Sequence, residues 1–495
     1  MAKSEPQNSC QTLKAMASWK INASNEDMRK YFFAFDEFSR IQSGDICLVL
    51  GRKGSGKTAI CEYLHNKPGE NKRSVLLSFK DFPFDHFYSG ANPTTAKSSQ
   101  YTNTWKLIVL SATCWLMSKD PRVDYKTRKL LAAHFTDDPT KALSLTLTKW
   151  TSGKLEIPDF GFGATGGSIE RAHIQNEQSL GERVARLEEF IARAAPDTTY
   201  YLLFDDLHED YTGEKDDSEY FIVLTGLISA ITHLRTKFRK QGKQIIPIAF
   251  VRDDIFGRLR HSDKNHWVDV QWNLHWELLS LQKMVIYRIC ADAGTSYNQD
   301  ALRCVLKDGS RISKMSKLFG KKGFDGERYV GLLEYMIELT QYRPRDLLKI
   351  FRLAATNTLA HDADIIDSDD ITNVEFEYSS YLRQEFEDEI HLVVPNFLAL
   401  VAPFRKYRVS VLPYDNLLKF IKQQPRTITQ GRPAQELIED LWYFGVIAVG
   451  HEKLHFRYME KSISPAFPVI MDQTDPSVPK ARVGIHAGLR PVLGF

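Results

Sequence analysis

Residues 51–59 have the types and spacing that bind the phosphates of a nucleotide. Residues 51–58 of this segment fit the pattern G-x-x-x-x-G-K-[ST] and lie between an apolar run and a segment of helical periodicity. Glycines let main-chain N–H groups turn inward around a phosphate, and the helix N-terminus adds positive potential. Lys57 would bridge the β- and γ-phosphates, and the Thr58 hydroxyl would bind Mg²⁺. The predicted phosphate loop comprises Gly51, Arg52, Lys53, Gly54, Ser55, Gly56, Lys57, Thr58 and Ala59.

Two adjacent acids, Asp205 and Asp206, end the apolar run YYLLFDDL. At the end of a buried strand, Asp205 would hold Mg²⁺ through water, and Asp206 would polarise the attacking water. Glu fills this second role more often, and an Asp side chain is one methylene shorter. Slow hydrolysis, or use of the nucleotide mainly as a switch, is therefore expected. The alternative interpretation of the pair is a strand-end cap or an acidic surface turn.

Several arginines follow at positions where they could contact a γ-phosphate. Arg252 ends the apolar run QIIPIAFV and could sense the phosphate, although an ion pair with Asp253 or Asp254 would also explain it. Arg345 lies in Y-R-P-R-D, where Pro344 pre-sets a helix start and would hold the arginine in a fixed direction. We predict that Lys57, Asp206, Arg252 and Arg345 act in catalysis, and that Thr58 and Asp205 bind the metal. Two further arginines are candidates for completing a neighbouring subunit's site, or for a solvated basic face, namely Arg258 and Arg260.

Alternating strands and helices must position these residues. Four apolar runs indicate buried strands, at residues 45–50, 74–79, 200–207 and 244–251, and residues 101–117 indicate a helix. This alternation predicts an α/β fold with a parallel sheet and helices on both faces. In such a sheet the carboxyl ends of the strands share one edge, where the glycine loop, the paired acids and Arg252 would meet.

The chain divides by pattern into five segments. We expect an N-terminal arm at 1–30, the α/β core at 31–270 with an insertion at about 119–180, a helical lid at 271–385, a winged-helix-like domain at 386–460 and a tail at 461–495. The insertion explains the long separation between the glycine loop and the acids, and residues 152–170 indicate a glycine-rich hairpin or loop. Three short helical patterns and two alternating runs indicate the winged helix.

Composition excludes some classes of protein. The 495 residues hold 65 Lys+Arg and 62 Asp+Glu, a formal charge of +3, so any nucleic-acid contact must be local. The six cysteines form no C-x-x-C pair, which favours free thiols in a reducing compartment. The longest apolar stretches are shorter than the roughly 20 residues that cross a bilayer, and the N-terminus lacks a leader pattern. We therefore expect a cytoplasmic protein with no membrane segment.

With the Gly51–Thr58 loop, the LLFDDL acids, the strand-end Arg252 and the Y-R-P-R helix start, the chain resembles the AAA+, STAND and KAP-type P-loop ATPases of the additional-strand class. It is also similar in its G-R-K-G-S-G-K-T loop to prokaryotic P-loop ATPases, some of them associated with anti-phage defence. The resemblance implies ATP and Mg²⁺ as cofactors, a helical lid and often a C-terminal winged helix. It covers residues 30–370 and, more loosely, 390–460. KAP-type relatives carry membrane helices in such an insertion, and we expect no membrane helix in the insertion of this sequence.

The resemblance also implies two possible roles. In the first, ATP binding and slow hydrolysis drive a molecular switch that assembles with copies of itself or controls a partner effector protein. In the second, an ATP-regulated protein binds DNA through its winged helix. The third helix of that domain carries Arg432 but also three acids, which would repel a phosphate backbone, so protein contact is favoured. Basic residues lie nearby, at Arg405, Lys406, Arg408, Lys419, Lys422 and Arg426.

Other enzyme classes fit less well. A small-molecule kinase would be more compact, and an ABC-type ATPase would carry an L-S-G-G-Q signature between the two nucleotide motifs. The pattern G-x-S-x-G does not occur in the sequence, and H-E-x-x-H occurs only at residues 451–455. That match falls in an expected turn between two alternating runs and not on a helix, where the two histidines would share one face, so the sequence supports no second active site.

Overall fold

The computed structural model describes residues 7–66, 69–78, 97–135, 180–207, 218–259, 262–307, 309–315, 327–451, 453–461, 467 and 480–494. The chain forms two compact units. The α/β unit comprises Ala34–Arg52 and Lys57–Asn273. The helical unit comprises Met1–Phe33, Lys53–Gly56 and Leu274–Phe495, so that it includes the tip of the phosphate loop. The expected glycine-rich hairpin at 152–170 lies outside the described residues, as does most of the expected insertion.

A five-stranded parallel sheet forms the centre of the α/β unit, in the order β2-β3-β4-β1-β5. The strands are β1 Leu48–Gly51, β2 Lys72–Ser78, β3 Thr199–Asp205, β4 Ile245–Arg252 and β5 Gln271–Asn273. The four predicted strands and the parallel α/β fold are confirmed, and the short β5 is an addition. Strand β4 lies between β1, which leads into the glycine loop, and β3, which ends in the paired acids.

The burial of the strands follows from their place in the sheet. Central strands β1, β3 and β4 are buried at nearly every residue, because helices cover both of their faces. The edge strand β2 alternates between buried and half-buried residues along its second half. The continuous apolar runs in the sequence therefore predicted the central strands, and the candidate site residues lie at the carboxyl ends of these strands.

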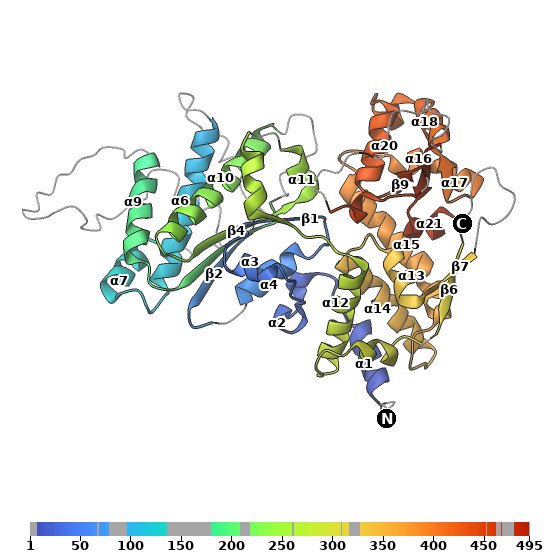
Figure 1. The fold of residues 1–495 in the computed structure, drawn as a ribbon, viewed down its shortest axis with the longest axis horizontal. Coiled ribbons are helices and arrows are strands. Elements are labelled where there is room, and N and C mark those ends of the chain that lie inside the picture. The colour runs from blue at the N-terminus through green and yellow to red at the C-terminus, as the bar shows by residue number, and fades with distance from the viewer. Residues whose placement is uncertain are drawn as a thin grey trace, which may run out of the picture. The chain divides into compact units, whose positions relative to one another are not determined.

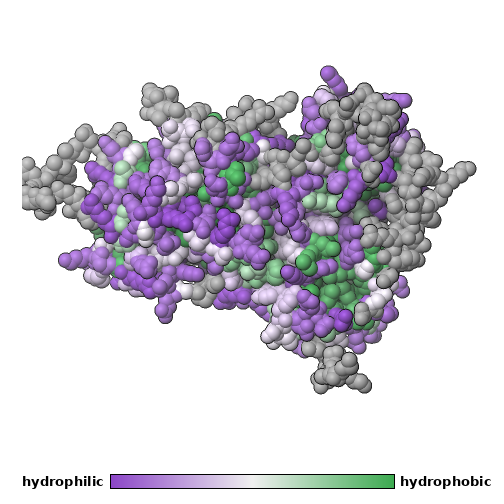
Figure 2. Space-filling view, in the orientation of Figure 1, coloured by the Kyte–Doolittle hydropathy of each residue, from purple (hydrophilic) through white to green (hydrophobic). Residues whose placement is uncertain are grey.

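Helices cover both faces of this sheet (Figure 1). Helix α4 Lys57–Asn66 packs on β1 to β4 from one side. Helices α6 Lys97–Ser118 and α10 Ser218–Lys240 pack together on the other side, and α9 Leu180–Ala194 and α7 Tyr125–His134 pack against α6. Short helices α3 Phe38–Gln42 and α11 Asp253–Arg258 precede β1 and follow β4. On the face drawn in Figure 2, hydrophilic residues cover most of this unit.

Among the described residues, one helix is long and apolar enough to be tested as a membrane span, residues Glu219–Lys240 of α10. Its most apolar window is 56% buried inside the protein. Because α10 packs against α6 and β4, its apolar composition is explained by a place in the core. All six cysteines are free, as the sequence predicted.

The helical unit contains a bundle of α12 Leu278–Asp292, α13 Leu332–Leu339, α14 Pro344–Ala360 and α15 Ser368–Ile390, with a hairpin of β6 Arg311–Met315 and β7 Glu327–Gly331. The N-terminal segment is part of this bundle. Helix α1 Gln7–Ala17 packs on α14, and the Trp19 indole donates a hydrogen bond of 2.6 Å to Asp292. The Arg288 guanidinium stacks on the Trp19 ring at 4.9 Å. The segment that we expected as an N-terminal arm therefore packs on the bundle through a helix and through aromatic residues that bind to α12.

The last part of the chain forms a small antiparallel sheet in the order β8-β10-β9. Its elements are α16 Phe397–Leu400, α17 Ala402–Tyr407, β8 Val411–Pro413, α18 Tyr414–Lys422, α19 Arg426–Thr429, α20 Ala434–Tyr443, β9 Ile447–Gly450 and β10 Arg482–Ile485. The expected helices are present. The two alternating runs that we expected in this domain correspond to β9 and an isolated bridge, and the strand paired with β9 is β10, which comes from the segment that we expected to be a tail. Residues 453–459 contribute an isolated bridge, between Val449 and His455.

These C-terminal elements pack closely on the helical bundle. The short helices η5 Ala487–Leu489 and α21 Arg490–Leu493 contact α15, and the buried His486 ring lies 3.2 Å from the Thr340 carbonyl oxygen. The two segments that we expected as lid and winged-helix-like domain therefore belong to one compact unit.

Candidate functional site

The phosphate loop runs from the end of β1 at Gly51 to the start of α4 at Lys57. Gly54 has φ +77° and Gly56 has φ +103°, a backbone conformation that residues with a Cβ rarely adopt. A Cβ on Gly54 would also lie 3.3 Å from the Arg345 Cβ. Both glycines are therefore required by the backbone. The helix that begins at Lys57 is ten residues long and directs its free N–H groups toward the loop.

Lys57 is half-buried at the carboxyl edge of the sheet. Its Nζ donates to the Gly51 carbonyl at 2.8 Å and to the Arg52 carbonyl at 3.0 Å. Burial lowers the pKa of Lys57 to about 8, opposed in part by the charges of Asp205 and Asp253. A cation held against its solvation preference is poised to gain from an anionic ligand.

Asp205 is the last residue of β3 and is only 5% exposed. Burial raises its pKa to about 6, the charge of Asp206 adds to this effect, and a hydrogen bond with the Thr58 hydroxyl opposes it. The two predicted metal ligands, Thr58 and Asp205, therefore lie in hydrogen-bond contact. A hydroxyl and a carboxylate beside a triphosphate cradle are the hard oxygen donors that Mg²⁺ prefers, so these residues fit the ion.

Asp206 has φ +58°, in the left-handed region that Asp tolerates better than most residues. Its carboxylate accepts a hydrogen bond of 3.0 Å from the Ser78 hydroxyl. Ser78 ends β2 and pairs in register with Asp205 on β3. The sequence analysis missed Ser78, whose only signal was its place at the end of an apolar run. Ser78 orients the carboxylate that we predicted would polarise water.

Arg252 ends β4 and lies opposite Gly51 of β1 in the sheet register. Its guanidinium forms two hydrogen bonds with the Asp254 carboxylate, at 3.0 and 2.7 Å. Burial alone would raise the pKa of Asp254, but the Arg252 charge and hydrogen bonds outweigh it and lower that pKa. The structure thus brings Arg252 to the predicted edge and shows the ion pair that was the alternative interpretation. Arg258 ends α11, and Arg260 lies outside the described residues.

The loop tip contacts several residues of the helical unit, of which it forms part. The Trp276 indole donates a buried hydrogen bond of 2.7 Å to the Ser55 carbonyl. Arg345 lies beside Gly54, and its Nη1 is 3.5 Å from Glu385 Oε2. Trp276 and Glu385 had no distinguishing signal in the sequence, because their roles depend on contacts far along the chain.

The C-terminal elements offer a basic surface beside an acidic helix. Six cations predicted there are exposed, at Arg405, Lys406, Arg408, Lys419, Lys422 and Arg426. Arg432, the basic residue that precedes α20, forms ion pairs with Asp440 at 2.6 Å and Glu436 at 3.6 Å and donates to the Val393 carbonyl. The charge of Arg432 is therefore paired with two acids of the helix that follows it.

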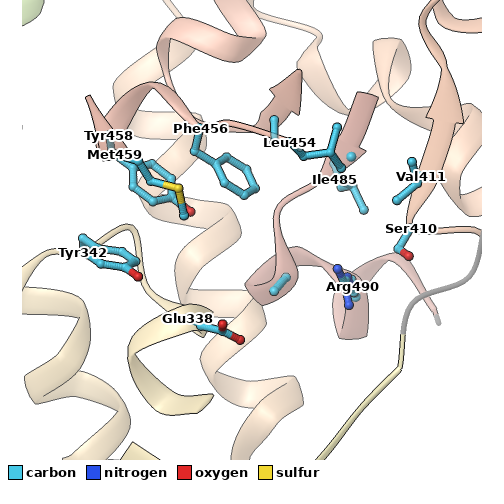
Figure 3. A pocket seen from close by; sticks show the side chains of 13 residues that line it. Glu338, Tyr342, Ser410, Val411, Leu454, Phe456, Tyr458, Met459, Ile485 and Arg490 are labelled. Carbon is cyan, nitrogen blue, oxygen red and sulfur yellow. The ribbon is translucent and has the colours of Figure 1, made fainter. Parts of the chain in front are cut away.

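A cavity of about 150 Å³ lies in the helical unit (Figure 3). Tyr342, Phe456 and Tyr458 form an aromatic wall, with the rings of Phe456 and Tyr458 stacked at 4.9 Å. Glu338 and Arg490 also line it. None of the predicted site residues lines this cavity, and the candidate catalytic groups remain those at the edge of the sheet.

Comparisons with known proteins give a distant set of relatives. A family model described as the FunZ-associated C-terminal helical domain matches residues 283–387, which span most of α12 to α15. A protein named for transposon gamma-delta, of 80.3 kDa, from Escherichia coli (strain K12) is 23% identical over 407 residues. That match covers 77% of this chain and 52% of the relative, so the chain spans about half of the relative's length.

Solved structures with a similar course of the chain are remote. Cdc6p from Pyrobaculum aerophilum is 12% identical, with a TM-score of 0.30 and coverage of 94% of this chain and 96% of that one. The Drosophila ORC bound to DNA is 12% identical, with a TM-score of 0.27 and coverage of 99% and 91%. The ORC2 protein of Aeropyrum pernix is 11% identical, with a TM-score of 0.29 and coverage of 88% and 86%. Scores this low carry no argument about the present chain.

Proposed function

We propose that this protein binds ATP with Mg²⁺ at the carboxyl edge of its parallel sheet, hydrolyses it slowly, and uses it to switch between states that assemble or control a partner. The observation that carries this proposal is the joint placement of the glycine loop, Lys57, Thr58 and Asp205. Strand order supports it as well, since β4 separates the loop strand from the strand that ends in acids. Mg²⁺, when bound, would neutralise charge on the phosphates.

The chain's own groups can perform the hydrolysis step. Lys57 would bind the β- and γ-phosphates after releasing the Gly51 and Arg52 carbonyls. Asp206, oriented by Ser78, would accept a hydrogen bond from a water whose oxygen forms the new bond to the γ-phosphorus. The bond from that phosphorus to the bridging oxygen breaks, giving ADP, phosphate and a proton. The short Asp206 side chain is the reason that we expect slow turnover.

Binding of MgATP to the purified full chain tests the nucleotide site. We expect measurable binding by calorimetry for the parent protein and a loss of at least about 100-fold for Lys57→Ala, because the lysine contacts two phosphates. Lys126→Ala, at an exposed lysine of α7, is the matched control and should bind as the parent does. Equal affinity of the parent and Lys57→Ala would contradict the proposal.

The switch itself has a separate test. Molecular mass by light scattering, with ATP, with ADP and without nucleotide, should differ if ATP drives assembly. A pull-down with Asp206→Asn, in which the nucleotide would stay bound, should enrich a partner effector protein over Lys57→Ala. Unchanged mass and no enriched partner would restrict the function to nucleotide binding. A role in prokaryotic defence remains an expectation from the resemblance.

DNA binding is the second candidate function, and the six exposed cations at residues 405–426 favour it. If these cations contact phosphates, affinity for duplex DNA should fall steeply as salt rises. Lys419→Glu combined with Lys422→Glu should weaken binding, and Arg303→Glu, at an exposed arginine outside this surface, is the control. Binding that is absent or insensitive to salt would exclude this function.

A further inference from the structure

The carboxylate of Glu385 on α15 contacts two cations at the tip of the phosphate loop. Its Oε2 atom lies 3.4 Å from Lys53 Nζ and 3.5 Å from Arg345 Nη1. Asp388, one helical turn further along α15, lies 3.9 Å from the same lysine nitrogen. One oxygen of the Glu385 carboxylate therefore forms ion pairs with both Lys53 of the loop and Arg345.

These groups are held in place rather than free in solvent. Glu385 is 16% exposed, Lys53 27% and Arg345 26%. Arg345 packs against Gly54, and Trp276 fixes Ser55 through a buried hydrogen bond. Pro344 in the first turn of α14 sets the direction of the following residue, Arg345. Ion pairs between such partly buried, ordered side chains lose less conformational entropy than pairs on an open surface.

We propose that Glu385 is a specificity-determining residue of the nucleotide site, which competes with the γ-phosphate for Arg345 and Lys53. The inference rests on the proposed ATP function and names its regulation. A nucleoside triphosphate that reaches Arg345 must displace the carboxylate. A diphosphate, which lacks the γ-phosphate, can bind while the Glu385 pairs stay intact. Glu385 thus lowers the affinity for ATP more than the affinity for ADP, and so it reduces the ratio of the two affinities.

The position of Glu385 on α15 gives this competition a route to the rest of the helical unit. Helix α15 also carries Glu389, which forms a buried ion pair of 2.6 Å with Arg343, two residues before Arg345. It packs against η5 and α21 at the end of the chain. Loss of the Glu385 pairs would therefore change the electrostatic anchoring of a helix that the C-terminal elements pack on.

The test measures the affinities of MgATP and MgADP for the full chain by calorimetry, with Glu385→Gln as the main variant. We expect ATP to bind Glu385→Gln about five- to tenfold more tightly than the parent, a gain of about 1–1.4 kcal/mol in binding free energy from the release of the two ion pairs, and the affinity for ADP to change by less than about twofold. Glu385→Asp, which keeps the charge, should stay close to the parent. Glu377→Gln on the same helix, whose carboxylate pairs with Lys349 3.7 Å away, is the matched control.

The outcomes separate this inference from the proposed function. A parent protein that binds no ATP overturns both. A parent that binds ATP while Glu385→Gln shows an unchanged or lower ATP-to-ADP affinity ratio overturns the role of Glu385 alone. Thermal unfolding of each variant is recorded alongside, because a purely structural role would change the unfolding temperature and shift both affinities together.

Discussion

Two clusters of buried charge in this protein differ in how well their charges are matched. At the edge of the parallel sheet, burial lowers the pKa of Lys57 to about 8 and raises the pKa of Asp205 to about 6. Between α14 and α15, burial opposes the charge of Arg343, but Glu389 and Asp346 outweigh it and raise the pKa of Arg343. The first cluster holds charges at a cost to stability, and the second is compensated within the fold.

This difference distinguishes the cluster at the edge of the sheet, which is the candidate binding site, from the cluster between α14 and α15, whose charges hold two helices together. When burial shifts a pKa so that the charged form is disfavoured, a ligand of opposite charge or a metal ion can stabilise that charged form by binding next to it. In the Arg343–Glu389 pair, 2.6 Å long and almost fully buried, each charge has an opposite charge as its partner. The comparison predicts opposite signs for the same operation: removing a charge should stabilise the first cluster and destabilise the second.

The largest effect is expected for Arg343→Met. This change leaves the Glu389 carboxylate buried without its partner, so the free energy of unfolding should fall by about 3–5 kcal/mol in denaturant titrations. Arg343→Met combined with Glu389→Leu should recover most of this loss, because no uncompensated charge remains. A double variant as unstable as the single one would show that packing, and not charge, dominates here.

Asp205→Asn should raise the free energy of unfolding, opposite to Arg343→Met, and the size of this gain should depend on pH. The folded pKa of about 6 lies above the ordinary value of 3.8, so the contribution of Asp205 to stability is full below about pH 4 and is lost as pH rises through 6. The variant should therefore be more stable than the parent by about 2–3 kcal/mol at pH 8 and equal to it near pH 4. Denaturant titrations at both pH values check this, and a constant difference between them would contradict it.

Lys57→Met should stabilise the protein while abolishing ATP binding. The folded pKa of about 8 lies below 10.5, so the cost of the buried charge applies in full below pH 8 and disappears above about pH 10.5. Since Lys57 is only half-buried and makes two hydrogen bonds, we expect a gain of about 1–2 kcal/mol at pH 7. Thermal unfolding against Lys126→Met measures it. Destabilisation would mean that the two carbonyl hydrogen bonds outweigh the burial of charge.

The smallest effect is expected for Ser78→Ala. Loss of the hydrogen bond to Asp206 should lower the rate of ATP hydrolysis by about two- to tenfold, in line with a hydrogen bond worth about 0.5–1.5 kcal/mol, and leave ATP affinity unchanged. Ser74→Ala on the same strand, where the hydroxyl bonds to His65, is the control. An unchanged rate of hydrolysis would contradict the role of Ser78 in orienting the Asp206 carboxylate.

Local pattern was enough to predict the strands, the glycine loop and the acids. Continuous apolar runs produce buried strands, and a glycine loop between strand and helix has one well-known chemical use. The order of the strands in the sheet was not predicted, because it depends on pairing between strands that are far apart in the chain. The strand β5 was missed because three half-buried residues give no periodicity. Strands β8 and β10 of the C-terminal sheet were missed as well. Strand β8 has only three residues, and β10 is far along the chain from β8 and β9, so that its pairing with both is a long-range contact.

The sequence by itself determined that this protein carries a glycine loop of the pattern G-x-x-x-x-G-K-[ST] and, later in the chain, two acids at the end of an apolar run, because those features depend on residues that are neighbours in the chain. Only the tertiary structure decided which side chains hold them. Ser78 orients Asp206, Trp276 fixes Ser55, and Glu385 occupies Lys53 and Arg345. Each partner is separated from its target by tens to hundreds of residues, so folding alone brings the charges close enough to set one another's energies.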